Sequence, residues 1–279
     1  MLALVGCAEH GAGGPQPDAA GPEDRDGDGI PDQLDNCADT PNPSQDNVDA
    51  DRDGDACDGC PLWITDDADR DGDGVLDTCD PHPDEPGDRI VLVERFRDLS
   101  RWQLVGDVTP TLAPLHVPPT LAPLTLISRQ AFEEPTVELF LGLGDEPPSR
   151  SAQFFRVWTG ATLDSDGLRG VRCGFDRDSA ETVFLGHLDL LEGTTTFHLD
   201  RAFPTSLEQG NSFRIFASTD AAESACLITD FDARPVMHGS HGVRRGQVAI
   251  DVLGMRATIM ALVIYAREPR SIEDPSRAR

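Results

Sequence analysis

Lysine is missing from this chain: none of its 279 residues is Lys, and Arg supplies every basic side chain other than His. Schiff-base chemistry and a lysine-based phosphate-binding loop are therefore excluded, because both require a Lys amine. Long apolar runs are missing too. No segment approaches the roughly 20 apolar residues that a helix needs to cross a bilayer, so no transmembrane helix is predicted.

Positive charge is scarce and unevenly distributed. The 23 Arg face 50 Asp and Glu, which gives a net charge of -27. Residues 1–88 hold 25 of the acids and only three Arg, so they carry most of the imbalance. Such a field repels nucleic acid and anionic lipid and attracts cations. A solvated, disordered acidic stretch is the alternative, but fixed spacing of Asp with Gly and Cys argues against it.

The acidic residues follow a twelve-residue spacing that occurs most clearly at Asp24–Asp35 and Asp69–Asp80. Carboxylates stand at positions 1, 3, 5, 9 and 12, and Gly stands at position 6, which is the spacing of a calcium loop. Position 7 offers its backbone carbonyl. The expected ligands are Asp24, Asp26, Asp28, Ile30, Asp32 and Asp35 in the first copy, and Asp69, Asp71, Asp73, Val75, Asp77 and Asp80 in the last.

A middle copy departs from this spacing and allows two registers. Counting back from Cys57 gives the ligands Asn47, Asp49, Asp51, Asp53, Asp55 and Asp58, with Asp53 using its carbonyl, but Arg52 then occupies the Gly position. A register two residues later restores Gly54 at position 6 and loses the acids at 9 and 12. We prefer the first register because it keeps the cysteine spacing. At least about three calcium ions are then expected.

Prolines flank the acidic loops, as in Thr40-Pro41-Asn42-Pro43, which argues against the paired helices of an EF-hand. Acids, Gly and interleaved cysteines, as in Asp35-Asn36-Cys37 and Asp55-Ala56-Cys57-Asp58, together resemble the thrombospondin type 3 repeat over residues 23–80. That resemblance implies irregular chain wrapped around calcium, with successive cysteines paired as Cys37–Cys57 and Cys60–Cys79. A zinc site or a redox pair on Cys57 and Cys60 is the alternative.

The first residues suggest a targeting signal. Leu4-Val5-Gly6-Cys7 resembles a bacterial lipobox, in which Cys7 would be lipidated, and a Gly/Pro/Ala-rich tether follows it. Met1–Val5 is too short for a full signal peptide, so a chance Cys remains open. The resemblance implies a lipoprotein of the bacterial cell envelope, on the outer membrane or cell surface, or a secreted protein.

Residues 89–268 change to short apolar runs separated by turns, which predicts an antiparallel β-sandwich. The expected strands are 90–96, 102–105, 124–128, 136–143, 152–158, 170–175, 182–188, 195–199, 212–217, 225–229, 247–252 and 257–266. The opening Phe96–Trp102 and the closing Gly246–Ile250 resemble concanavalin A-like, laminin-G-like jelly rolls. Cys173 and Cys226 fall in predicted strands and form either a disulfide or two buried thiols.

The whole chain is therefore expected to be all-β, with a jelly-roll sandwich preceded by an irregular, calcium-bound, disulfide-linked segment. The predicted division is a truncated signal and tether at 1–22, calcium repeats at 23–85, the sandwich at 89–268 and a disordered tail at 269–279. Asp189 with Glu192, and His238 with His241, are the nearest candidates for a catalytic or further metal site, and surface turns explain them better.

The favoured function is a non-catalytic, surface-anchored calcium-binding lipoprotein whose sandwich binds glycan or a protein partner in adhesion. A jelly-roll glycoside hydrolase and a purely structural envelope spacer are the alternatives.

Overall fold

The computed structural model describes residues 23–106, 109–144, 153–165, 167–177, 183–191, 194–203, 212–220, 223–229, 236–239 and 243–267. The predictions for residues 1–22, including Cys7, and for the tail at 269–279 lie outside these ranges. Within them the regular elements are all β-strands, in two sheets, and no helix is long and apolar enough to span a membrane. The all-β prediction is confirmed.

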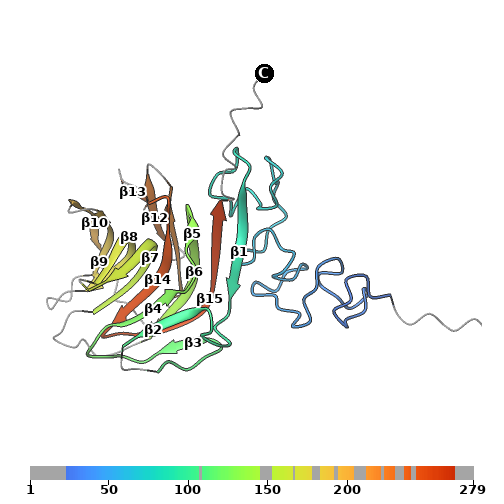
Figure 1. Ribbon diagram of the computed structural model, residues 1–279, viewed down its shortest axis with the longest axis horizontal. Helices are drawn as coiled ribbons and strands as arrows, with labels where there is room; N and C mark the ends of the chain where they lie inside the picture. The colour runs from blue at the N-terminus through green and yellow to red at the C-terminus, as the bar shows by residue number, and fades with distance from the viewer. Residues whose placement is uncertain are drawn as a thin grey trace, which may run out of the picture.

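Most strands of the sandwich lie in two antiparallel sheets (Figure 1). The first sheet runs in the order β1 (Asp88–Glu94), β15 (Arg256–Arg267), β6 (Thr136–Gly144), β11 (Ser212–Thr219), β12 (Ser224–Thr229) and β13 (Val236–Gly239), with β3 (Leu115–Val117) also paired to β15. The second runs β10 (Thr194–Phe203), β9 (Val183–Leu191), β8 (Gly167–Arg177), β7 (Gln153–Asp164), β14 (Arg245–Leu253), β4 (Leu124–Ser128) and β2 (Trp102–Val105), with β5 (Phe132–Glu133) paired to β14.

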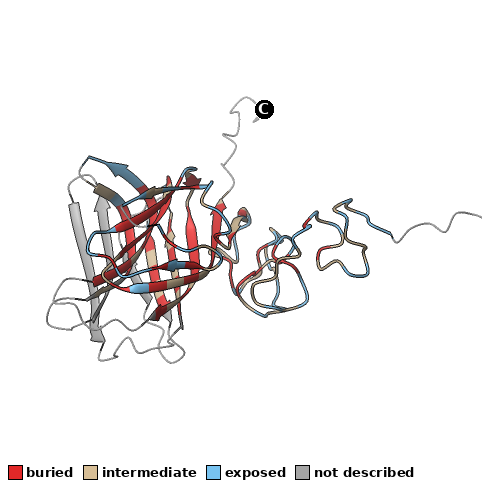
Figure 2. Ribbon diagram, turned by 90° about the horizontal axis from the view of Figure 1, so that it is seen from below, coloured by how far each residue is buried: buried red, intermediate tan, exposed pale blue. Residues whose placement is uncertain are grey.

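The main hydrophobic core lies between the two sheets. In β6, the alternating residues Val137, Leu139 and Leu141 all belong to this core and are 0% exposed, so the intervening Glu138 projects from the other face. The second sheet contributes Phe155 and Val157 in the same way. The buried strands are drawn red in Figure 2. The predicted β-sandwich is therefore confirmed, with its core between the two sheets.

A disulfide between Cys173 and Cys226 crosses this core, joining β8 of the second sheet to β12 of the first. Both side chains are fully buried. The structure therefore contains the disulfide rather than the two free thiols left open by the sequence.

Three of the strands were not predicted, and each has a local reason. Strand β3 is three residues long and lies between Pro114 and Pro118, β5 is two residues long, and β13 includes His238, which was expected at a surface turn. Asp189 was placed at a turn, but β9 extends to Leu191 and includes it. His241 and Glu192 lie outside the described residues.

Candidate metal centres

The acidic segment is irregular chain that extends from β1, as the right-hand part of Figure 1 shows. Its three loops share one hydrogen-bonding scheme. In each, the backbone N–H at position 2 donates to the carboxylate at position 9: Arg25 to Asp32 at 2.9 Å, Val48 to Asp55 at 2.8 Å, and Arg70 to Asp77 at 3.0 Å. The three loops therefore have the same local conformation when Asn47 is counted as position 1 of the middle copy.

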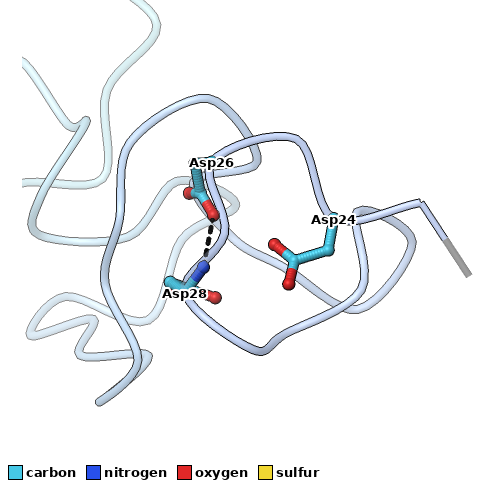
Figure 3. A group of neighbouring side chains, drawn as sticks. All are labelled: Asp24, Asp26 and Asp28. Carbon is cyan, nitrogen blue, oxygen red and sulfur yellow. Dashed lines mark hydrogen bonds between the residues drawn. The ribbon is translucent and has the colours of Figure 1, made fainter.

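The first loop gathers the carboxylates of Asp24, Asp26 and Asp28, whose candidate ligand oxygens lie within 4.8 Å of one another (Figure 3). The two oxygens of Asp24 accept the N–H groups of Gly27 and Gly29 at 2.9 and 3.1 Å. Both glycines have positive φ, at 78° and 97°, which a side chain would disfavour. The glycines thus let the backbone turn around the carboxylates.

The third loop repeats this geometry. Asp69, Asp71 and Asp73 form an equivalent group, and Asp69 accepts the N–H groups of Gly72 and Gly74 at 2.7 and 3.0 Å. In both loops the position 3 carboxylate also accepts the N–H two residues on. Hydrogen bonds from backbone N–H groups to the loops' own carboxylates therefore hold the conformation of both loops.

The middle loop has no glycine at the equivalent turn. Ala50 adopts the positive φ of 62° there, and its N–H donates to Asn47 Oδ1 at 2.6 Å. The acidic group consists of Asp49, Asp51 and Asp58. Gly54, which the alternative register places at position 6, instead donates its N–H to the carbonyl of Asn36 at 3.0 Å.

Several buried carboxylate oxygens in the three loops have no hydrogen-bond partner. Each is the Oδ2 atom of an acid at position 3, 9 or 12, and the residues are Asp26, Asp35, Asp49, Asp55, Asp71 and Asp80. A buried acceptor left unmet is costly, so such atoms are rare without an ion or water. Convergent hard oxygens with unused lone pairs fit Ca²⁺.

Burial also perturbs the ionisation of these acids. Desolvation raises the pKa of Asp58 to about 7 and that of Asp80 to about 7, and neighbouring carboxylates act in the same direction. Desolvation likewise raises the pKa of Asp26 and Asp71. A bound divalent cation would lower the pKa of each of these four carboxyl groups.

Two of the expected ligands, Asp32 and Asp77, lie outside the converging acidic groups. Both oxygens of Asp32 accept from Arg25, through the backbone N–H and Nε, and Arg70 engages Asp77 identically. The backbone N–H of Arg25 lowers the pKa of Asp32 most strongly, and the Arg70 side chain does so for Asp77. These position 9 acids therefore close their loops structurally. The backbone contributions expected of Ile30, Asp53 and Val75 stay predictions.

The structure also brings in an acid that the twelve-residue pattern did not include. Asp88, the first residue of β1, lies with Asp73 and Asp80 in a fourth acidic group. It falls between the predicted repeat segment and the predicted sandwich, and no signal in the spacing marked it.

Two disulfides cross-link the acidic segment. They join Cys37 to Cys57 and Cys60 to Cys79, which are the pairs that the repeat resemblance implied. Because Cys57 and Cys60 belong to different disulfides, they form neither a zinc site nor a redox pair.

The third loop packs on the outer face of the first sheet. Cys60, Leu62 and Val75 form a second hydrophobic cluster with Val263 and Tyr265 of β15. Trp63 belongs to the edge of this cluster. The acidic segment is thus attached to the sandwich by side-chain packing as well as by the chain itself.

A polar contact lies beside this cluster. Glu138, 4% exposed, accepts the indole N–H of Trp63 at Oε1 and the hydroxyl of Tyr265 at Oε2, the latter at 3.1 Å. The Arg214 guanidinium lies 3.5 Å from the centre of the Trp63 ring. Burial raises the pKa of Glu138, and these donors lower it. The outward Glu of β6 is therefore an anchor for the acidic segment.

Comparison with known families and structures agrees with both halves of the chain. The thrombospondin type 3 repeat model matches residues 18–45. The CBM2 module of Lactobacillus casei BL23 phage J-1 evolved Dit is 8% identical at a TM-score of 0.51, covering 66% of this chain and 98% of that one. None of the curated protein sequences matches the chain.

Two further structures are similar at lower TM-scores. Carbohydrate binding module CBM66 from Bacillus subtilis is 15% identical, with a TM-score of 0.43, covering 57% of this chain and 92% of that one. The Lotus tetragonolobus seed lectin is 10% identical, with a TM-score of 0.45, covering 63% and 97%. The chain therefore combines an acidic segment, of which residues 18–45 match the thrombospondin type 3 repeat, with an antiparallel jelly-roll sandwich.

Proposed function

We propose that this protein is a non-catalytic, calcium-binding protein whose acidic segment is a calcium-stiffened arm for a glycan-binding sandwich. The observation that carries the proposal is the set of buried, unpartnered carboxylate oxygens at matching positions of three loops. Calcium would supply the charge that these oxygens require. Asp26 and Asp71, at position 3, would each hold one ion together with the acids at positions 1 and 5 of their loops. Asp49, at position 3 of the middle loop, would hold one together with Asp51 and Asp58.

Binding of calcium by these loops is tested on the whole chain. Calcium titration by flow dialysis is expected to give at least about three bound ions. Asp71→Asn is expected to weaken one of them, while Asp66→Asn, an exposed acid outside the motif, leaves all of them unchanged. A wild-type chain that binds no calcium would end the proposal.

The outer face of the second sheet supports the glycan part of the proposal. Arg156 donates through Nε to Asp176 Oδ1 at 2.9 Å, and Thr125 donates to Asp251 Oδ1 at 3.1 Å. The Arg156 guanidinium lies 3.6 Å from the centre of the Phe154 ring. Of these side chains Arg156 and Asp176 are the more exposed, and the Arg156 guanidinium suits hydrogen bonds to sugar hydroxyls.

This face lies on the opposite side of the sandwich from the acidic arm (Figure 1). The arm packs against β15 in the first sheet, whereas Arg156 and Asp251 lie on β7 and β14 of the second. The neighbour at a TM-score of 0.51 is a CBM2 module, which is consistent with this role. We therefore place the proposed ligand on the face opposite the arm.

A glycan array with the calcium-loaded chain tests this part. Arg156→Ala is expected to reduce binding by about tenfold or more, since it removes a charged donor. Arg101→Ala, at an exposed turn before β2, is the matched control. Absence of binding to any glycan would leave the spacer interpretation, and release of sugar products would establish the hydrolase instead.

We also propose that the protein is anchored in the bacterial envelope through acylated Cys7. The motif Leu4-Val5-Gly6-Cys7 supports this. Expression of the natural precursor in a bacterial host, followed by intact mass measurement, is expected to show a lipid-sized mass increase that Cys7→Ser abolishes. An unmodified wild-type protein in the aqueous phase would refute the anchor.

A further inference from the structure

Strand β1 is the outermost strand of the first sheet and lies on the side from which the arm extends (Figure 1). Its only partner among the described strands is β15. The other edge of β1 is therefore a row of backbone N–H and C=O groups without a neighbouring strand. Such an edge is a template on which a further strand can pair.

A cavity of about 630 Å³ runs along this free edge. Six consecutive residues, 90–95, line it. Because the side chains of a strand alternate between its two faces, a cavity over one face would contact only every second residue. Contact with consecutive residues places the backbone of β1 at the cavity wall. Six residues of strand span about 20 Å, the length of a short extended peptide.

A β-bulge interrupts the pairing of β1 with β15 at Val91. Ile90 lies opposite Tyr265 and Leu92 lies opposite Ile264, so Val91 is the extra residue. The Val91 side chain is 43% exposed. It lines the larger cavity and also a smaller one of about 270 Å³. Val91 therefore offers an apolar contact to a chain that follows the edge.

The arm forms the opposite wall of the larger cavity. Pro41 and Pro43 line this wall, together with Asn42 and Ser44. A proline has no N–H to donate to a strand ladder, so this stretch of the arm is poorly suited to pair with β1. The arm is therefore a wall beside the edge, and the ladder positions of β1 face the space between them.

The smaller cavity is basic. Among the described residues, three arginines and one acid line it, in a protein whose net charge is -27. The acid is Glu133, which already accepts from Arg245 at 2.9 Å. The arginines are Arg89, Arg245 and Arg267. Because Arg89 lies on β1, two residues before Val91, charge complementarity favours an acidic group at this end of the edge.

We propose that the free edge of β1 binds an extended acidic peptide of a partner protein by strand addition. The peptide backbone would pair with β1 in the space beside the arm, an apolar side chain would contact Val91, and an acidic side chain would lie beside Arg89. A second copy of this chain is a poorer occupant, because two molecules of net charge -27 repel each other. This site is separate from the sugar face on the second sheet.

The test uses the full chain with calcium and the acetylated, amidated hexapeptide Asp-Val-Thr-Val-Thr-Val as the probe. Hydrogen exchange of residues 89–95 is expected to slow by about tenfold or more when the probe binds, because its backbone would protect the free edge. The same hexapeptide with Pro at its second and fourth positions lacks two ladder donors and is expected to give no protection.

Two variants of the chain locate the probe. Val91→Asp is expected to weaken its binding by about tenfold or more, since it replaces an apolar contact by a like charge. Leu163→Asp is the matched control, because Leu163 is also exposed, at 38%, and lies near the end of β7. Arg89→Ala is expected to weaken the acidic probe about threefold or more and to leave its Asn-for-Asp version unchanged. This variant decides the matter should Val91→Asp fail to fold.

The outcomes separate strand addition from its alternatives. No protection of residues 89–95 at about 1 mM probe would overturn the inference and leave the bulge as a device that prevents pairing at the edge. Equal protection by the Pro-containing probe, or equal weakening by Val91→Asp and Leu163→Asp, would also overturn it. Protection by an oligogalacturonate and not by the hexapeptide would assign the cavity to an acidic glycan instead.

Discussion

Trp63 is expected to control how firmly the arm is held on the sandwich. Its indole N–H donates to Glu138, and its ring lies under the Arg214 guanidinium. Trp63→Phe keeps an aromatic ring and removes the donor. A hydrogen bond to a charged group contributes about 1.5–3 kcal/mol. The docked state should therefore lose roughly 10- to 150-fold in its equilibrium with an undocked arm.

Hydrogen exchange on the full calcium-loaded chain measures this loss. Peptides covering residues 60–65 should exchange faster in Trp63→Phe by that factor, whereas peptides from the sandwich core should not change. Ile64→Ala is the control, because the neighbouring Ile64 side chain is 74% exposed. If Trp63→Phe and Ile64→Ala show the same protection within twofold, the anchoring role of Trp63 is wrong.

Three further predictions concern the loops and the core. Asp71→Asn should weaken calcium binding at the third loop by about tenfold or more, because charge count sets the affinity of such sites; a titration identical to wild type would contradict the ligand role. Replacing Cys60 and Cys79 together by Ser should lower the stability of the arm by about 3 kcal/mol in the chain-entropy model, measured by urea unfolding without reductant; an unchanged midpoint would show that the disulfide adds nothing. Gly174→Ala should destabilise the sandwich by about 1–3 kcal/mol, since a Cβ there would lie 2.1 Å from the Phe155 carbonyl oxygen. In Gly142→Ala the added Cβ would have only Met260 Cε nearby, at 3.6 Å, so the melting temperature should stay close to that of the wild type. Equal melting temperatures for Gly174→Ala and Gly142→Ala would refute this reasoning.

The sequence was most informative where spacing and chemistry coincide. Acids, glycines and cysteines together predicted the irregular, disulfide-linked arm, and short apolar runs bounded by turns predicted β2 and β4 to the residue. The short strands β3, β5 and β13 were not predicted, because pairing with a neighbouring strand, rather than composition, makes these residues strands. Strand β3 contains only Leu115–Val117 and exists because β15 offers its edge.

The joint between arm and sandwich could not be predicted from local patterns. Glu138 has the alternation of a solvent-facing residue, and only the packing of Trp63, 75 residues earlier in the chain, makes it a buried anchor. Asp88 likewise lies outside the twelve-residue motif. Asp88 belongs to the fourth acidic group because the chain comes back to Asp73, whose carboxylate accepts the Asp88 N–H. No spacing rule for a single loop includes that contact. At position 9 the spacing predicts Asp32 as a ligand, and the structure adds hydrogen bonds from Arg25 to both of its oxygens; the ligand role of Asp32 stays a prediction.

The central claim, that calcium stiffens the arm, is tested most directly by hydrogen exchange on the full chain with calcium and with chelator. The N–H groups of Gly27, Gly29, Gly72 and Gly74 all donate to position 1 carboxylates and report on the loops. Calcium is expected to slow their exchange by about 100-fold or more, a coupling of roughly 2.7 kcal/mol, while the amides of β6 and β15 stay equally protected. Equal exchange at these glycines with and without calcium would contradict the account.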